Sequence, residues 1–110
     1  MEVRTEIPPG TLIMLILKTL KRIGPMHGYG IAQHIQATSD DVLTVEEGSL
    51  YPALQKMLIK GWVVADWKQT ENNRRARFYR LTPAGKKQLA AEIAEFERVM
   101  GAIGRVIQPA

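Results

Sequence analysis

The sequence predicts one mainly helical α+β domain. Three features predict it: apolar residues recur at helical spacing in three stretches before residue 61, two β-rich runs flank a polar turn between residues 62 and 81, and a heptad-spaced apolar stripe follows residue 84. The length of 110 residues suits a single domain with a modest core. An apolar fraction of 45% and a charged fraction of 24% are typical of a soluble globular protein.

The first predicted helix covers residues 12–23. Pro8-Pro9-Gly10 ends any structure before it, and we expect the Thr11 hydroxyl to cap its first amides. The helix is apolar on nearly every side, so more than one of its faces has to be covered. A small three-helix domain offers little such cover, which favours a partner subunit. Gly24-Pro25 ends the helix.

A second helix is predicted after His27-Gly28. Its core-facing side chains recur at helical spacing: Tyr29, Ile31, Ala32 and Ile35. His27 and His34 have no third ligand nearby, so we expect surface or capping roles for them and no metal site. Turn-forming residues 38–41 follow, and then a short segment rich in β-branched residues, 42–45.

The third predicted helix, residues 46–60, starts with a capping box between Thr44 and Glu47. Its core face holds Leu50, Leu54, Met57 and Leu58. Its opposite arc holds Ser49, Pro52, Gln55, Lys56, Ile59 and Lys60, with Tyr51 and Gln55 at the border. The Pro52 ring presses on the carbonyl of Gly48, which predicts either a re-aimed first turn or a helix that starts later.

A hairpin is predicted after Gly61, which ends the third helix. Residues 62–69 and 76–81 are rich in Val, Trp, Phe and Tyr and are interpreted as strands. The polar residues 70–75 form the tip, where an Asn can adopt the left-handed conformation in place of Gly.

The last predicted helix starts at Thr82-Pro83-Ala84, with Pro at its first position. Its apolar residues are spaced 4, 3, 4, 3 and 4 apart, as in a heptad repeat: Leu89, Ile93, Phe96, Met100, Ile103 and Ile107. This stripe could complete the core of its own chain. We favour an interface between subunits, formed by the stripe together with Leu12, Leu15 and Ile16, because a single helix follows an already complete domain.

The positive charge is concentrated in one part of the chain. Residues 56–80 contain seven basic and two acidic residues, a net +5, whereas the other residues sum to −1 and the whole chain to +4. A basic excess on a near-neutral body indicates a surface that binds phosphate. A merely solvated charged face is the alternative when charge is considered alone.

Three helices followed by a hairpin with a basic tip are the element order of a winged helix-turn-helix. In that fold the third helix enters the DNA major groove and the hairpin, or wing, contacts the adjacent backbone or minor groove. We therefore predict base or phosphate contacts from the third helix and wing contacts to phosphate or the minor groove. The hydroxyls of Tyr29 and Tyr79 could also reach phosphate, although we favour partial core packing for both. In chain order the candidate contact residues are Tyr29, Ser49, Tyr51, Pro52, Gln55, Lys56, Lys60, Asn73, Arg74, Arg75, Arg77 and Tyr79.

Four segments closely resemble the PadR family of bacterial regulators. They are His27-Gly28-Tyr29-Gly30-Ile31, Glu47-Gly48-Ser49-Leu50-Tyr51-Pro52-Ala53-Leu54, Gly61-Trp62-Val63 and Arg77-Phe78-Tyr79-Arg80-Leu81-Thr82-Pro83-Ala84-Gly85. They occur in the family's order and spacing. The resemblance implies a dimeric repressor that binds double-stranded DNA. It also implies a C-terminal helix that crosses the first helix of the partner subunit.

The sequence also departs from parts of this family. It has one C-terminal helix, as in the short branch, and Phe96 stands on it where some multidrug-responsive relatives carry a tryptophan. A large drug-binding pore is therefore not expected. An effector, if one acts on this protein, is expected to change the spacing of the two winged domains through the C-terminal helices.

These features predict a winged domain at residues 8–83 and a dimerisation helix at residues 84–108. No cysteine, phosphate-cradling loop or catalytic cluster occurs, so we expect neither an enzyme nor a cofactor. No apolar run is long enough to span a membrane, and a cytoplasmic location is the default expectation. The rival interpretation is a winged-helix protein-interaction module without DNA binding, against which Gln55, Lys56 and Lys60 argue.

Overall fold

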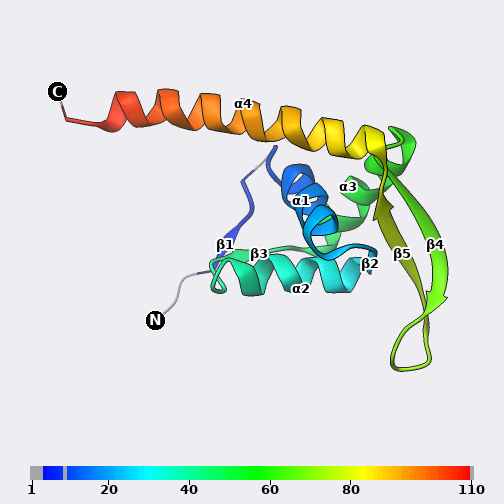
Figure 1. Cartoon of the computed structure of the whole chain (residues 1–110). Coiled ribbons are helices and arrows are strands. Elements are labelled where there is room, and N and C mark those ends of the chain that lie inside the picture. Colours follow the sequence, from blue (N-terminus) through cyan, green and yellow to red (C-terminus); the bar gives the residue numbers. More distant parts are fainter. Residues whose placement is uncertain (1–3, 9, 110) are drawn as a thin grey trace.

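The computed structural model describes residues 4–8 and 10–109. Four helices and five strands occur within these residues. In chain order they are β1 (Thr5–Glu6), α1 (Leu12–Ile23), β2 (Met26–His27), α2 (Gly28–Thr38), β3 (Leu43–Thr44), α3 (Glu47–Ile59), β4 (Val63–Gln69), β5 (Arg75–Leu81) and α4 (Pro83–Ile107). Figure 1 shows α4 running across the top of the domain and projecting beyond it, while the β4–β5 hairpin extends downward.

The four helices and the hairpin confirm the predicted architecture, but two short strands were not predicted. β1 pairs in parallel with β3, and β2 pairs antiparallel with β5 to form a sheet of order β2-β5-β4. The two strands that were not predicted, β1 and β2, have two residues each, which is too few to show the alternation by which a strand is recognised. Pro9 belongs to the segment that was predicted to end any structure before α1, and it lies outside the described residues.

The core surrounds α1. Its largest fully buried side chains are Ile16, Leu17, Ile31, Leu50, Leu54, Met57, Val63 and Leu89. On α2 the core face consists of Ile31 and Ile35, one helical turn apart, with Ala32 packed beside them. The prediction that Tyr29 faces the core was wrong, because a residue two positions before Ile31 lies on the other side of the helix and is 64% exposed.

Two predicted caps were also wrong. α1 starts at Leu12 as expected, but the Thr11 hydroxyl donates to the Pro8 carbonyl at 2.7 Å and does not cap the helix. Thr44 is paired with Glu6 in the β1–β3 ladder, so no capping box forms and Glu46 is the N-cap of α3. His27 does cap α2, since its Nδ1 accepts the Gly30 N–H at 2.9 Å.

A compact joint links the start of the hairpin to the start of α4. The Thr82 N–H donates to the Trp62 carbonyl at 3.1 Å, and the Thr82 hydroxyl donates to the Gly61 carbonyl at 2.7 Å. The same hydroxyl accepts the Gly85 N–H at 3.0 Å, which confirms the predicted helix start with Pro83 in its first turn. A Cβ on Gly85 would lie 2.1 Å from the Trp62 carbonyl oxygen. The joint therefore requires glycine at residue 85 and sets the direction in which α4 leaves the sheet.

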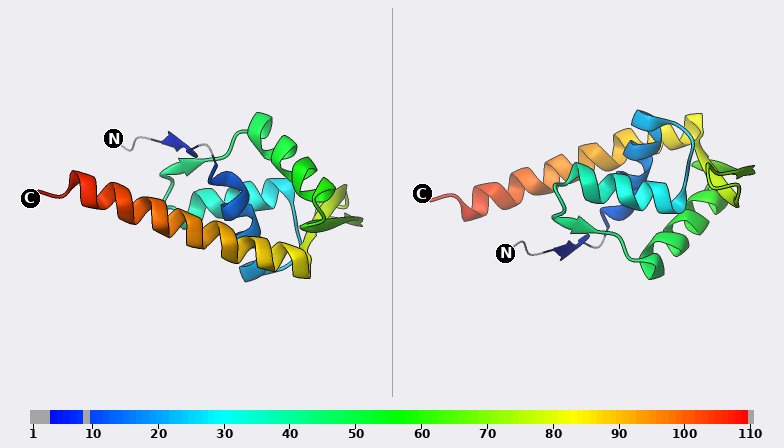
Figure 2. Two further views of the ribbon diagram at one scale, coloured as in Figure 1. Left: turned by 90° about the horizontal axis from the view of Figure 1, so that it is seen from above. Right: turned by 90° about the horizontal axis from the view of Figure 1, so that it is seen from below.

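The apolar stripe of α4 is divided between two environments. Leu89 is 2% exposed and Ile93 packs beside it on the core, which includes Ile16 at 0% exposure. Ile16 and Leu89 were predicted at a subunit interface; instead they are enclosed by their own chain, because α4 packs along α1. Leu12 and Leu15 are half-buried against the same core. The C-terminal end of α4 projects past the body in both views of Figure 2. The remaining stripe residues are exposed: Phe96, Met100, Ile103 and Ile107.

Candidate nucleic-acid interface

Helix α3 presents a polar face to solvent. Leu50, Leu54 and Met57 are buried beneath it. The residues that the helical spacing placed opposite the core are exposed: Ser49, Tyr51, Pro52, Gln55, Lys56, Ile59 and Lys60. Glu47 and Gly48 in the first turn are exposed as well. The helix is continuous from Glu47 through Pro52, so the interpretation that its first turn starts later was wrong.

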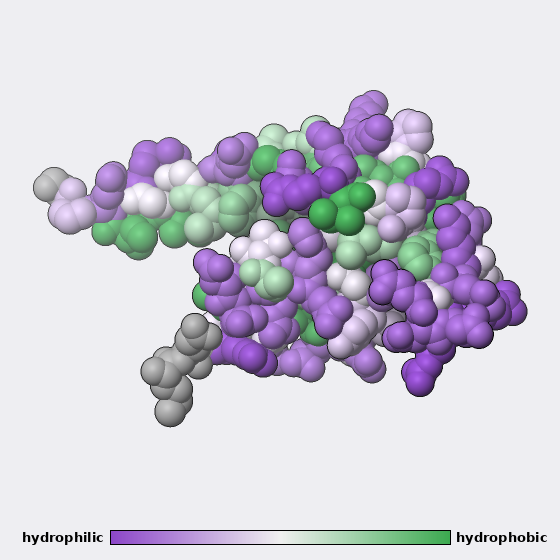
Figure 3. Space-filling model, turned by 60° about the horizontal axis from the view of Figure 1, so that its bottom comes forward, coloured by the Kyte–Doolittle hydropathy of each residue, from purple (hydrophilic) through white to green (hydrophobic). Residues whose placement is uncertain are grey.

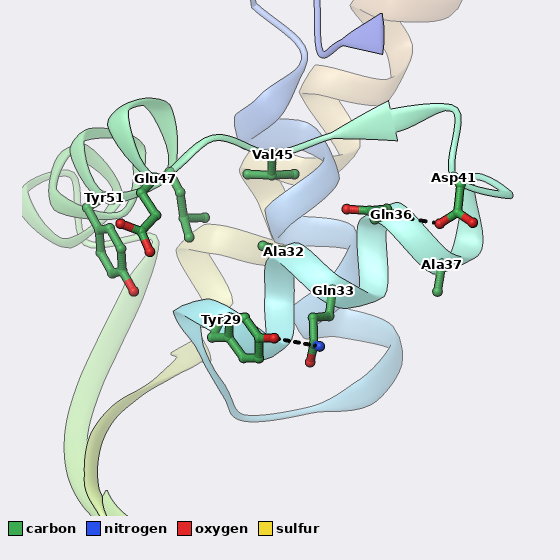
Figure 4. A pocket seen from close by; sticks show the side chains of 10 residues that line it. Tyr29, Ala32, Gln33, Gln36, Ala37, Asp41, Val45, Glu47 and Tyr51 are labelled. Carbon is green, nitrogen blue, oxygen red and sulfur yellow. Dashed lines mark hydrogen bonds between the residues drawn. The ribbon is translucent and has the colours of Figure 1, made fainter. Parts of the chain in front are cut away.

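Tyr51 connects the start of α3 to the start of α2. Its ring lies against Gly28, where a Cβ would approach the ring atoms to 3.1–3.3 Å. Glycine at residue 28 therefore leaves the space that the tyrosine ring occupies. Tyr29 lies nearby on α2, and its hydroxyl accepts a hydrogen bond from Gln33 Nε2 at 3.0 Å. Both tyrosines line a hollow between α2 and α3, with Gln33 and Glu47 beside them (Figure 4).

The wing is a regular antiparallel hairpin of two seven-residue strands. Its tip closes through the Thr70 N–H, which donates to the Arg74 carbonyl at 2.7 Å, and the Asn73 N–H, which donates to the Thr70 carbonyl at 3.0 Å. Asn73 has a φ of 59°, which confirms that an Asn adopts the left-handed conformation there. Arg74 is exposed beside it.

The two faces of the wing differ in their side chains. Near the body, Val63 on β4 and Tyr79 on β5 are buried, so this face is the inner one. Because side chains alternate along a strand, Trp67, Arg75 and Arg77 continue the same face toward the tip, where all three are exposed. The register places Trp67 directly opposite Arg77. Lys68 and Arg80 belong to the outer face.

A second hollow lies between the inner face of the wing and the helical body. The body contributes His27, Gly28, Tyr29 and Tyr51, and the wing contributes Trp67, Thr70, Asn72, Arg74, Arg75, Ala76, Arg77 and Tyr79. Seen from below, α2, α3 and the hairpin lie on one side of the molecule and α4 lies behind them (Figure 2). Hydrophilic side chains dominate the wing end in Figure 3. The two tyrosines and the wing arginines thus line one open hollow, and Tyr51 connects that hollow to the exposed face of α3.

Comparison with known proteins agrees with this arrangement. Residues 16–91 match the model of the transcriptional regulator PadR-like family, a span that includes α2, α3 and the wing. The chain belongs to the PadR-like family. A Lysinibacillus sphaericus protein described as uncharacterized is 27% identical over 97 residues, which cover 88% of each chain.

Solved structures of regulators share the PadR-like fold. A transcriptional regulator from Clostridium thermocellum is 25% identical with a TM-score of 0.82, and the match covers 90% of this chain and 95% of that one. A putative transcriptional regulator from Thermoplasma acidophilum is 28% identical with a TM-score of 0.73, covering 92% and 95%. A PadR family regulator from Eggerthella lenta, 24% identical with a TM-score of 0.76 over 92% and 85%, shows the same fold. The family and these neighbours are transcriptional regulators and not enzymes.

One residue of the predicted interface has a different place in this PadR-like chain. Tyr79 is 5% exposed and belongs to the core, which confirms the expected core packing and corrects its expected role as a DNA contact. Burial raises the pKa of its hydroxyl, and the neighbouring Arg77 opposes that rise. Tyr79 and Arg77 share the inner face of β5, so the difference comes from their distance to the body: Tyr79 is covered by it, whereas Arg77, two residues nearer the tip, lies beyond its cover.

Trp67 was assigned to the first wing strand and was not predicted at the interface. It lies in the hollow with Arg75 and Arg77 and is 60% exposed. The alternation of Val63, Ala65 and Trp67 was available in the sequence and places them on one face. The sequence does not show how far the helical body extends along that face, and this extent decides which of the three side chains are covered.

In the part of the chain that the structure describes, no group of three or more His, Cys, Asp or Glu residues could hold a metal ion. Among the described helices, none has the length and apolar character needed to cross a lipid bilayer.

Proposed function

We propose that this PadR-like regulator binds double-stranded DNA as a homodimer and represses transcription by occluding a promoter. Each α3 would enter the major groove of one half-site of a pseudo-palindromic operator, with the half-sites about one DNA turn apart. The observation that carries the proposal is the open hollow in which Tyr51, on the exposed face of α3, and the arginines of the wing lie together.

The residues of this surface would divide their work. Side chains on α3 can hydrogen-bond base edges, and the amide of Gln55 suits adenine. Sequence choice is expected to follow Ser49, Tyr51, Gln55 and Lys56. Affinity is expected to follow Arg74, Arg75 and Arg77, because contacts to phosphate are independent of sequence. Lys60, Asn73 and the Tyr29 hydroxyl would add backbone contacts, and Pro52 would touch a thymine methyl.

The far half of α4 supports the homodimer. It leaves a row of large apolar side chains uncovered, from Phe96 at 41% exposure to Ile107 at 75%. A contiguous apolar surface of this kind on a small protein indicates a protein–protein contact. A second copy of the chain is the expected partner, since two copies would present two α3 helices to a palindrome.

The test begins with genomic DNA fragments, which are captured on the purified protein, sequenced and scored for a palindrome. Binding to the recovered site is then measured by fluorescence anisotropy over a series of salt concentrations. The double variant Arg74→Ala/Arg75→Ala should bind all sequences more weakly. Its slope of log K against log salt should fall by about 0.9 for each phosphate contact removed.

Lys86→Ala/Lys87→Ala is the matched control. It removes two positive charges from exposed positions on α4, outside the proposed interface, and should leave the slope unchanged. An unchanged slope in the arginine variant would remove the wing from the phosphate contacts. No captured DNA at low salt would favour the rival protein-interaction module.

A further inference from the structure

Trp67 is a large apolar side chain in the part of the wing that is otherwise polar and basic. It is 60% exposed, whereas Val64, the most exposed aliphatic residue of β4, is 38% exposed. Trp67 lies on the inner face, two residues beyond Ala65, where the strand passes the edge of the helical body. Burial within the chain therefore does not account for an indole ring at this position.

The arginines beside Trp67 are held over flat aromatic rings. The guanidinium carbon of Arg75 lies 5.4 Å from the centroid of the Trp67 ring, and that of Arg77 lies 5.9 Å from the centroid of the Tyr79 ring. Cation–π attraction of this kind restrains the guanidinium groups and leaves their N–H edges available. The inner face of the wing thus presents positive charge and an aromatic surface together.

Tyr29 and Tyr51 line the opposite wall of the same hollow, at 64% and 47% exposure. A DNA strand that passes between α3 and the wing would have Trp67 on one side and the two tyrosines on the other. Its phosphates can be neutralised by Arg75 and Arg77. Its deoxyribose rings are less polar and need an apolar partner, which Trp67 provides.

We propose that Trp67 is a DNA contact whose indole packs against the deoxyribose of the strand held between the wing and α3. This rests on the proposed DNA-binding function and deepens it. The contact removes apolar surface from water and releases no counterions, so it contributes the same factor to affinity at every salt concentration. It thus differs in kind from the arginine contacts around it.

The test compares Trp67→Ala, Trp67→Phe and the control Val64→Ala in anisotropy titrations with the recovered DNA site. Val64 lies on the outer face of the same strand. Trp67→Ala should bind about tenfold more weakly at each salt concentration, with the salt slope unchanged. Trp67→Phe should recover most of the loss, and Val64→Ala should bind like the wild type.

Tryptophan fluorescence gives a second, independent measurement. The chain has two tryptophans, and Trp67→Phe leaves only Trp62, which is half-buried at the joint. Adding the DNA site should change the emission of the wild type, and the change should be absent in Trp67→Phe.

The outcomes separate this inference from the function on which it rests. If the wild type binds DNA and Trp67→Ala binds equally well, the inference alone is overturned. If Trp67→Ala lowers the salt slope as much as Arg75→Ala does, Trp67 only holds Arg75 in place and the direct contact is overturned. If the wild type binds no DNA, both are overturned.

Discussion

The two halves of α4 carry the same apolar stripe and have different surroundings. In the near half, Leu89 and Ile93 pack on the chain's own core, and Leu89 is 2% exposed. In the far half, Ile103 is 45% exposed and Ile107 is 75% exposed, although both continue the same spacing. The space-filling view shows apolar side chains along the projecting end of the helix (Figure 3).

This difference shows what a heptad pattern determines and what it does not. The spacing places six side chains on one face of a helix. Whether that face meets the same chain or another one depends on how far the body extends beneath it. At 25 residues α4 is about 37 Å long, and the α1 helix that supports it has 12 residues. The near half therefore contributes to folding, and the far half is free to contribute to assembly.

The largest effect is expected at the joint from which the near half starts. Gly85→Ala would place a Cβ 2.1 Å from the Trp62 carbonyl oxygen, a backbone atom that cannot move without opening the joint. The free energy of unfolding should fall by about 3 kcal/mol or more, measured by urea unfolding. Gly101→Ala on the far half is the control, since its only close neighbour is the end of the Arg105 side chain, and it should gain up to about 1 kcal/mol. Equal effects at the two glycines would contradict the tight joint.

Leu89→Ala is expected to lower the free energy of unfolding by a comparable or smaller amount. Leu89 is among the most buried side chains of the core, so truncating it should cost about 2–5 kcal/mol at any protein concentration. The paired variant Ile103→Ala should change the urea midpoint only at concentrations at which the chain is associated. A concentration-independent loss in both variants would mean that the two halves of α4 do not differ as their exposure indicates.

Ile103→Lys should abolish association with little effect on the fold of the protomer. A charge in the centre of the exposed stripe would be buried without a partner in a dimer, whereas in the monomer it remains in water. Sedimentation velocity should show a smaller species, and affinity for a palindromic site should fall toward that of a single half-site. Ala94→Lys, at an exposed position outside the stripe, should behave as the wild type. An unchanged sedimentation coefficient for Ile103→Lys would exclude the far half as the interface.

The smallest effect is expected at the Glu95–Arg98 ion pair on α4. The hydrogen bond from Arg98 lowers the pKa of the Glu95 carboxyl, so any stabilisation is present at neutral pH and is lost as pH falls through that lowered pKa. Both side chains are exposed, and solvent and salt screen the pair. Glu95→Gln should leave the thermal unfolding midpoint unchanged at pH 7. A clear loss there would show that a partner chain encloses the pair.

Local chemistry was enough to predict most elements. Helical spacing, the Thr82-Pro83 start of α4, the left-handed Asn73 and the β-rich runs of the hairpin each depend on residues close together in the chain. The motifs that resemble the PadR family are local too, and they placed α3 and the wing in the correct order. The polar face of α3 followed from periodicity alone.

Several errors involve contacts between distant segments, whereas the errors at Thr11 and Tyr29 were local. Thr44 fits a capping box by spacing, but pairing with β1 places it in a strand. Tyr79 and Trp67 share one face of the wing, and only the edge of the body decides that the first is buried and the second exposed.

Periodicity alone thus assigned most side chains to the correct face, because the geometry of a helix or strand is set within a few residues. Only the tertiary structure decided what covers each face, because cover is supplied by segments far away in the chain. For α4, this assigns Leu89 to the core of its own chain and leaves Ile103 exposed for a partner.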